Sequence, residues 1–295
     1  MAILARTVRV VGAIALSAVS IAAQSQTPPA PAPAPAAPPA TGQAPAASIP
    51  VFVDDLLRAR IAQGGLAFGV PVSLAVACRQ AGGPNQIQLG FEAGVPMNAP
   101  RPLSIMFAIV DRAGRVLNAG KRIVSDPAET DEGRLTFAMP ITPGLYKLRL
   151  AVSDAAGRIG AAETDVAGYL TPMGSVRVSD VLMAWSRADG QYRFLGLPEA
   201  PARTHAVRVS LEIYNDAPTA DRAAQTWAVQ FTLTAEHDTM PAFEQKAVAT
   251  GPGTALAASV VLPMDKIPSG LYTLRAAVLN GVSVLGSVTR QLHVE

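Results

Sequence analysis

The densest cluster of potential metal ligands in this sequence is Glu236, His237 and Asp238, which follow one another directly. Imidazole and carboxylate groups bind zinc when several of them converge on one point. Neighbouring residues of a strand point to opposite faces, so only Glu236 and Asp238 would converge here. The pattern therefore favours a solvated strand end over a metal site. The sequence also lacks an Asp-x-Asx-x-Asx calcium loop, and we predict neither a metal nor a cofactor.

Two short motifs approach catalytic signatures without completing them. Residues 281–286, GVSVLG, would need a glycine at position 285 to form a nucleophile elbow, but that position is Leu285. Residues 251–254, GPGT, lack the lysine that ends a phosphate-binding loop. Asp54 and Asp55 are neighbours on a predicted helix, so their carboxylates point in different directions. We therefore predict that the protein is not an enzyme.

Cys78 is the only cysteine among the 295 residues. One thiol cannot form an intrachain disulfide, so the fold must be stabilised by packing. Cys78 shares one face of a predicted strand with Val72, Leu74 and Val76. This position favours a small buried hydrophobic residue, with a reactive or intermolecular thiol as the alternative.

Aromatic residues make up only 5% of the chain, and three of them lie close together at Trp185, Tyr192 and Phe194. One interpretation is an exposed patch that binds a protein or a carbohydrate. The other is that the three side chains seal a junction between two domains, which is the commoner fate of large apolar groups. We favour the junction and keep the three residues as the candidate interaction patch.

The N-terminus has the pattern of a secretion signal. Arg6 and Arg9 precede an uncharged run from Val10 to Ala23, and Ser20-Ile21-Ala22 fits a small-x-small cleavage site. The run has 14 residues, whereas a membrane-spanning helix needs roughly 20. We predict a signal peptide over residues 1–23, no membrane span after its cleavage, and a secreted or periplasmic location. A retained membrane anchor is the alternative.

The next segment, residues 24–49, consists almost entirely of proline, alanine and small polar residues. Repeated Ala-Pro favours polyproline II and offers nothing to bury, so we predict a disordered, semi-rigid linker. Cleavage after residue 23 leaves 22 basic and 22 acidic side chains. A neutral chain without a lysine or arginine cluster gives no electrostatic reason to bind nucleic acid.

The remainder predicts an all-β fold built from two tandem domains. Residues 50–65 have acids early and glycines late, which indicates a short helix. From residue 70 the apolar pattern alternates, and seven short strands predict an immunoglobulin-like or fibronectin-III-like β-sandwich over residues 66–170. We predict a bridging hairpin over residues 171–204 and a second sandwich over residues 205–295, with a similar series of alternating strands.

The two sandwiches are predicted to be copies of one fold. PGLYKLRLAV at residues 143–152 recurs as SGLYTLRAAV at residues 269–278, which is 126 positions later. In each copy a Gly-Leu-Tyr begins a late strand, where a tyrosine can bury its ring and return its hydroxyl to the backbone. Tyr146 and Tyr272 are therefore predicted to form structural tyrosine corners. A paired ligand site at these tyrosines is the alternative.

TPGLYKLRLAVSDAAGRIG at residues 142–160, followed by GSVRVSDVLMAW at residues 174–185, resembles a region of known proteins. These are large secreted bacterial proteins that begin with a von Willebrand factor A domain, and the likeness is to their C-terminal sandwich region. It covers roughly residues 51–190. Their A domain binds metal through Asp-x-Ser-x-Ser, which this chain lacks, so neither the domain nor its metal site carries over. The resemblance implies a non-catalytic, extracytoplasmic module.

The sequence thus predicts a secreted or periplasmic binding or scaffold protein that acts through its sandwich surfaces on a protein partner in the cell envelope. The alternative is a carbohydrate-binding protein or an accessory of a hydrolase that acts on envelope polymers. Fold alone does not decide between them.

Overall fold

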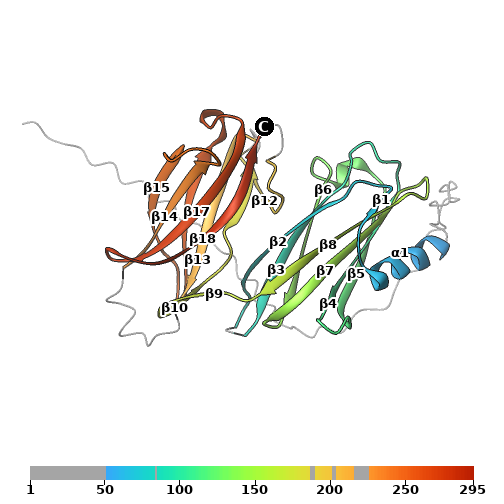
Figure 1. Ribbon diagram of the computed structural model, residues 1–295, viewed down its shortest axis with the longest axis horizontal. Helices are drawn as coiled ribbons and strands as arrows, with labels where there is room; N and C mark the ends of the chain where they lie inside the picture. The colour runs from blue at the N-terminus through green and yellow to red at the C-terminus, as the bar shows by residue number, and fades with distance from the viewer. Residues whose placement is uncertain (1–50, 84, 187–189, 201–203, 216–225) are drawn as a thin grey trace, which may run out of the picture. The chain divides into compact units, whose positions relative to one another are not determined.

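The computed structural model describes residues 51–295 apart from 84, 187–189, 201–203 and 216–225 (Figure 1). The signal peptide and the Pro/Ala-rich linker predicted for residues 1–49 lie outside the described residues. Residues Ile49–Glu295 belong to one compact unit. Within the described ranges, no helix combines the length and the apolar character needed to cross a membrane.

The prediction of an all-β chain with one short helix is confirmed. Helix α1 spans Val51–Gln63, and two antiparallel sheets follow it in the first module. One sheet has the order β1-β8-β7-β4-β5 and the other β2-β3-β6. Their strands are β1 Ala67–Phe68, β2 Ser73–Gln80, β3 Ile87–Gly94, β4 Leu103–Val110, β5 Val116–Val124, β6 Arg134–Ile141, β7 Gly144–Ser153 and β8 Ile159–Gly168, with the 3-10 turn η1 Pro127–Glu129 after β5.

The second module repeats this plan with the sheet β15-β14-β17-β18 and a second sheet centred on β13. Its later strands are β13 Ala206–Tyr214, β14 Trp227–Ala235, β15 Phe243–Val248, β16 Ala255–Pro263, β17 Gly270–Asn280 and β18 Ser283–Val294, with the 3-10 turn η2 Met264–Lys266 after β16. The described strand order β8-β7-β4-β5 of the first module matches β18-β17-β14-β15 of the second. Likewise the order β2-β3-β6 of the first module matches β11-β13-β16 of the second.

The segment predicted as a bridging hairpin belongs to the second module instead. Residues 171–204 contain β9 Thr171–Met173, β10 Val176–Val178, β11 Leu182–Ser186 and β12 Tyr192–Leu195. Strands β10 and β11 both pair with β13, and β12 pairs with β11. The reason is that the inward side chains of β11 belong to the hydrophobic core of the second module, so the hairpin completes a sheet.

The repeat is visible in the strand register. Val152 pairs with Gly160 in the β7–β8 hairpin, and the residues 126 positions later, Val278 and Gly286, pair in β17–β18. The neighbouring strand does not keep this offset, because Val278 faces Val229 while Val152 faces Ile105, which lies 124 positions before Val229. The two-residue slip is even, so the same face of the strand remains inward.

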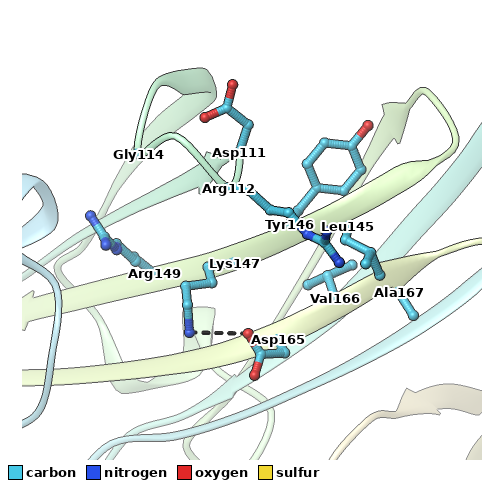
Figure 2. A pocket seen from close by; sticks show the side chains of 10 residues that line it. All are labelled: Asp111, Arg112, Gly114, Leu145, Tyr146, Lys147, Arg149, Asp165, Val166 and Ala167. Carbon is cyan, nitrogen blue, oxygen red and sulfur yellow. Dashed lines mark ion pairs between the residues drawn. The ribbon is translucent and has the colours of Figure 1, made fainter.

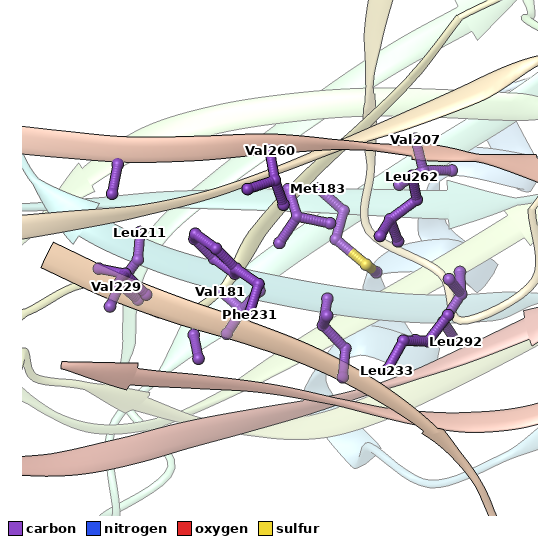
Figure 3. Close-up of a cluster of buried hydrophobic side chains, with 14 of the residues drawn as sticks. Val181, Met183, Val207, Leu211, Val229, Phe231, Leu233, Val260, Leu262 and Leu292 are labelled. Atoms are coloured by element: carbon purple, nitrogen blue, oxygen red, sulfur yellow. The ribbon is translucent and has the colours of Figure 1, made fainter. Parts of the chain in front are cut away.

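Each module has its own buried core. In the second module the inward residues of the two sheets meet, as Val207, Leu211 and Val260 do with Phe231 and Leu233 (Figure 3). In the first module a corresponding cluster includes Leu103, Ile105, Leu135 and Val152. Alternation along the strands places these side chains on one face, which is the arrangement expected of packed sheets.

Helix α1 covers part of the outer face of the first module's five-stranded sheet. Its Leu57 and Ile61 pack against Ala108, Ala151 and Ala161. Alanines at these sheet positions leave room for a helix to approach closely. At the C-terminal end of the helix, the Arg149 guanidinium donates to the carbonyl oxygens of Ile61 and Ala62, each at 3.0 Å. A cation in this position satisfies carbonyls that the helix leaves unpaired.

Candidate functional site

The two candidate corner tyrosines have matching contacts. The Tyr146 hydroxyl donates to the Thr142 carbonyl oxygen at 2.8 Å, and the Tyr272 hydroxyl donates to that of Pro268 at 2.8 Å. Both acceptors lie four residues before the tyrosine. A Cβ on Gly144 would lie 2.4 Å from the Tyr146 hydroxyl, which explains the glycine at this position of the first copy. The two tyrosines belong to separate modules, and the structure does not bring them together in one site.

The candidate aromatic patch is divided between two faces of a sheet. Trp185 is only 1% exposed and belongs to the second module's core, so its place in an exposed patch is a wrong prediction. The cause is its register opposite Val207, whose side chain also points inward. Tyr192 and Phe194 lie on the opposite, outward face and are half-buried.

Cys78 is buried, as the sequence predicts. Burial raises the pKa of its thiol from the ordinary value of 9.0 to about 12, and the nearby Asp180 carboxylate adds to the shift. The thiol is therefore neutral near neutral pH, which removes the thiolate needed for nucleophilic chemistry.

The acidic cluster around His237 lies beyond the end of β14 rather than in a strand, and all three side chains are exposed. Across the described ranges, no group of three histidine, cysteine, aspartate or glutamate side chains is arranged to hold a metal ion.

A concave surface of about 550 Å³ lies on the first module between the β4–β5 turn and strands β7 and β8 (Figure 2). Its lining combines Leu145 and the Tyr146 ring with charged groups. Lys147 lies 3.0 Å from both Glu163 and Asp165, and Figure 2 shows it directed toward Asp165. The Lys147 ammonium donates hydrogen bonds to the carboxylates of Glu163 and Asp165, and these bonds raise the pKa of Lys147.

Most other charges around this surface have structural tasks. The Asp111 carboxylate accepts the backbone N–H groups of Ala113 and Arg115 at 2.9 Å and closes the β4–β5 turn. These backbone bonds, that of Arg115 first, lower the pKa of Asp111. Arg149 is bound to the end of α1 and to Glu163 at 2.8 Å. In the described structure, Arg112 is the cation of this lining that has no polar partner.

A second group of polar residues joins the first module to the second. The Glu92 carboxylate is fully buried and lies 2.6 Å from the Arg134 guanidinium. It also accepts the backbone N–H of Gly196, from the segment after β12, at 2.5 Å. Arg134 in turn donates to the Glu199 carbonyl oxygen at 2.6 Å. The Glu92–Arg134 ion pair thus accepts one hydrogen bond from the second module and donates one to it.

Asp180 makes a second connection, at the open edge of β2. The Cys78 N–H donates to the Asp180 carboxylate at 2.7 Å, and the Asp180 N–H donates to the Cys78 carbonyl oxygen at 3.0 Å. Two residues along the same edge, the Gln80 N–H donates to the Tyr214 hydroxyl at 2.9 Å. These groups satisfy an edge that would otherwise present unpaired backbone.

Arg290 of β18 binds the chain just before β11 and just after β12. Its guanidinium donates to the carbonyl oxygens of Val181, at 2.7 Å, and Gly196. Burial lowers the pKa of Arg290, and the carboxylates of Asp180 and Glu92 partly oppose this effect. Burial raises the pKa of Asp180. The hydrogen bond from the Cys78 N–H and the charge of Arg290 partly oppose this effect.

Two adjoining cavities, of about 510 and 330 Å³, are lined by residues of the first module together with residues of β11, β12 and β13 of the second. Thr136 of β6 and Phe194 of β12 line both of them, so we call the pair the junction groove. The Phe194 ring comes within 3.6 Å of where a Cβ on Gly90 would lie. The groove is further lined by five arginines, which are Arg79, Arg122, Arg134, Arg193 and Arg208.

Sequence reasoning missed the junction residues apart from Tyr192 and Phe194. Glu92 and Glu212 occupy matching positions on the outward faces of β3 and β13, and Glu212 also accepts a bond there, from the Tyr214 hydroxyl. An acidic residue repeated at the same strand position was the available signal. The partners of Glu92, which are Arg134 and Gly196, lie 42 and 104 positions away in sequence, and strand periodicity does not reveal them.

Comparisons with known proteins give no family for the chain. No family model matches, and no curated protein matches. Among solved structures, the native conformation of E. coli alpha-2-macroglobulin is similar over 77% of this chain and 16% of its own, with 11% identity and a TM-score of 0.22. This chain therefore spans a small part of that protein.

Two further solved structures are similar at the same identity. A tetra-tandem repeat in the extending region of a large adhesion protein is 11% identical, covers 77% of this chain and 75% of its own, and has a TM-score of 0.24. A glycosyl hydrolase family 2 member from Bacteroides cellulosilyticus DSM 14838 is 11% identical, covers 76% of this chain and 28% of its own, and has a TM-score of 0.21. None of the three is described as containing a von Willebrand factor A domain. Similarities at this level carry no argument about function.

Proposed function

We propose that this chain is a non-catalytic binding or scaffold protein, secreted or periplasmic, that acts through the surfaces of its two β-sandwiches. The partner we expect is a protein of the cell envelope. The resemblance of residues 51–190 to the sandwich region of secreted A-domain proteins agrees with this proposal and is itself a prediction.

The observation that carries the proposal is the edge strand β5. It pairs with β4 on one side and forms the end of the five-stranded sheet in the described structure. A bulge at Leu117 interrupts the pairing at one end, and Val116, Leu117 and Ile123 are exposed large apolar side chains on this strand. An edge with free backbone groups and exposed apolar side chains can accept an added strand from a partner.

The use of buried charge also supports the proposal. Glu92 pairs with Arg134 at the junction, Arg149 holds the end of α1, and Asp154 accepts backbone N–H groups within its own turn. Each of these groups stabilises a specific contact of the fold. A general acid, base or nucleophile would instead need to face a substrate.

The experiment is site-specific photocrosslinking in the envelope fraction of the producing cell. A photoreactive residue replaces Leu117 on β5, and a matched probe replaces Val282, which is 95% exposed at the β17–β18 turn. The proposal expects one abundant protein crosslinked from Leu117 and little from Val282. Equal, unspecific crosslinking from both positions would contradict it, as would release of soluble fragments from envelope polymers by the purified protein.

A second candidate function, carbohydrate binding, is favoured by the junction groove. Tyr192 and Phe194 lie on the face that borders it, next to arginine, hydroxyl and amide side chains.

A further inference from the structure

We propose that the junction groove binds an oligosaccharide that carries carboxylate groups, such as a short chain of uronic acids. This inference deepens the second candidate function and rests on it. Together the two cavities fall within the range of roughly 300–1,000 Å³ that is common for small-ligand sites, and such sites occur preferentially where domains meet.

The arginines that line the groove differ in how far their charge is balanced by carboxylates. Arg134 is neutralised by Glu92, and the Arg193 guanidinium lies 3.0 Å from the Asp131 carboxylate. Arg122 donates to the backbone carbonyl oxygen of Glu129 at 3.3 Å, which leaves its charge only loosely balanced. The Glu129 carboxylate accepts hydrogen bonds from the backbone N–H groups of Ser125 and Asp126, each at 2.8 Å.

Arg208 on β13 stacks on an aromatic ring beside the groove. Its guanidinium lies over the Tyr192 ring, 3.8 Å from the ring centroid. Among the residues that the structure describes, Arg208 forms no ion pair, and its side chain is exposed. Arg79, nearby on β2, has only a long contact of 3.5 Å with Glu212. Stacking holds the guanidinium plane in place, and a planar guanidinium can bind a carboxylate through two parallel hydrogen bonds.

The neutral polar side chains of the groove suit a sugar better than other anions. Gln88, Thr136 and Ser210 line the same groove, and each can both donate and accept hydrogen bonds. Sugar hydroxyl groups need partners of both kinds. The Phe194 ring offers an apolar face against which the C–H groups of a sugar ring can pack. A peptide would instead require paired backbone groups, and an arginine-lined groove with hydroxyl and amide groups suits a carboxylated sugar better.

Isothermal titration of the purified protein tests this proposal, with trigalacturonic acid as the probe and the neutral galactose trimer as its control. We expect the acid to bind and the neutral trimer to bind at least about tenfold more weakly, since bonds to charged groups are the stronger ones. We also expect binding of the acid to weaken as the salt concentration rises.

Arg208→Gln is the test variant, because it removes the charge and keeps a polar side chain on an exposed position. Arg112→Gln is the matched control, since Arg112 is an exposed, unpaired arginine on the other concave surface (Figure 2). We expect Arg208→Gln to weaken binding of the acid about tenfold or more and Arg112→Gln to leave it unchanged.

Three results would overturn the assignment. They are the absence of binding to trigalacturonic acid at millimolar concentration, an equal loss in both variants, and equal or tighter binding of hexaglutamate, which would assign the groove to acidic peptides. Crosslinking from Leu117 in the Arg208→Gln protein separates the two proposals. If it persists without sugar binding, the scaffold role stands and the present inference fails.

Discussion

Single hydroxyl groups hold one loop in each module. The Tyr146 and Tyr272 hydroxyls each donate to a backbone carbonyl oxygen four residues earlier. Replacing either by phenylalanine leaves that carbonyl without its donor. We expect Tyr272→Phe to lower the free energy of unfolding by about 1–2 kcal/mol. Tyr146→Phe should lower it by about 0.5–1 kcal/mol, because water can reach the exposed Thr142 carbonyl. Urea denaturation measures both. Tyr169→Phe is the control, because Tyr169 is an exposed tyrosine; equal midpoints for all three variants and the parent would contradict the account.

The Cys78 thiol predicts a specific pH dependence of stability. Its pKa is about 12 in the folded protein and near the ordinary 9.0 when burial is lost. Below pH 9 the thiol is neutral in both states, so its stabilising contribution is complete there. As the pH rises from 9 toward 12 the unfolded chain loses this proton first, so stability falls.

Cys78→Ala measures that contribution. The variant removes the titrating group, so the free energy of unfolding should fall less steeply between pH 8.5 and 10.5 than in the parent protein. Denaturation at a series of pH values gives both slopes. Identical slopes would mean that the thiol ionises equally easily in both states. Below pH 9 the folded thiol should also resist alkylation.

Helix α1 packs on its sheet through Leu57 and Ile61, and Leu57 is the more deeply buried of the two. Leu57 is 0% exposed against the sheet, whereas its neighbour Leu56 is 38% exposed. We expect Leu57→Ala to lower the free energy of unfolding by about 2–5 kcal/mol, through lost burial and the cavity left behind. Leu56→Ala should change it by less than about 0.5 kcal/mol. If the two variants unfold at the same denaturant concentration, α1 does not rest on the sheet as described.

A buried ion pair between Glu92 of β3 and Arg134 of β6 stabilises the junction. Glu92→Gln leaves the Arg134 guanidinium without its carboxylate, which should cost about 3–5 kcal/mol of stability, the scale for breaking a buried ion pair. Asp55→Asn breaks the exposed pair with Arg58 and should cost less than about 1 kcal/mol. Denaturant unfolding of both variants checks this, and comparable small losses would show that Glu92 is hydrated in solution.

Strand positions could be predicted largely from the sequence, because alternation and turn residues are local signals. The seven strands β2–β8 and the repeated β7–β8 and β17–β18 hairpins follow from them. The tertiary use of the residues could not be predicted equally well. Trp185 lies inward because β11 pairs with β13, and Glu92 is buried because Gly196 lies 104 positions away in sequence and beside it in space.

In the whole molecule, the two modules contact each other at the junction groove. Residues of β2, β3, β5 and β6 line it from the first module, and residues of β11, β12 and β13 line it from the second. The β2 edge reports on this contact directly, because the Cys78 N–H donates to Asp180 and the Gln80 N–H donates to Tyr214. By strand alternation, the Val76 N–H faces the same edge, where the described residues provide it with no partner.

Amide hydrogen exchange at this edge, followed by NMR, tests whether the two modules meet in solution. We predict that the Cys78 and Gln80 amides exchange at least about tenfold more slowly than that of Val76, given the strength of hydrogen bonds to charged and polar side chains. Asp180→Ala should remove the protection at Cys78. Equal exchange at Cys78, Gln80 and Val76 in the parent protein would show that the modules do not meet there in solution.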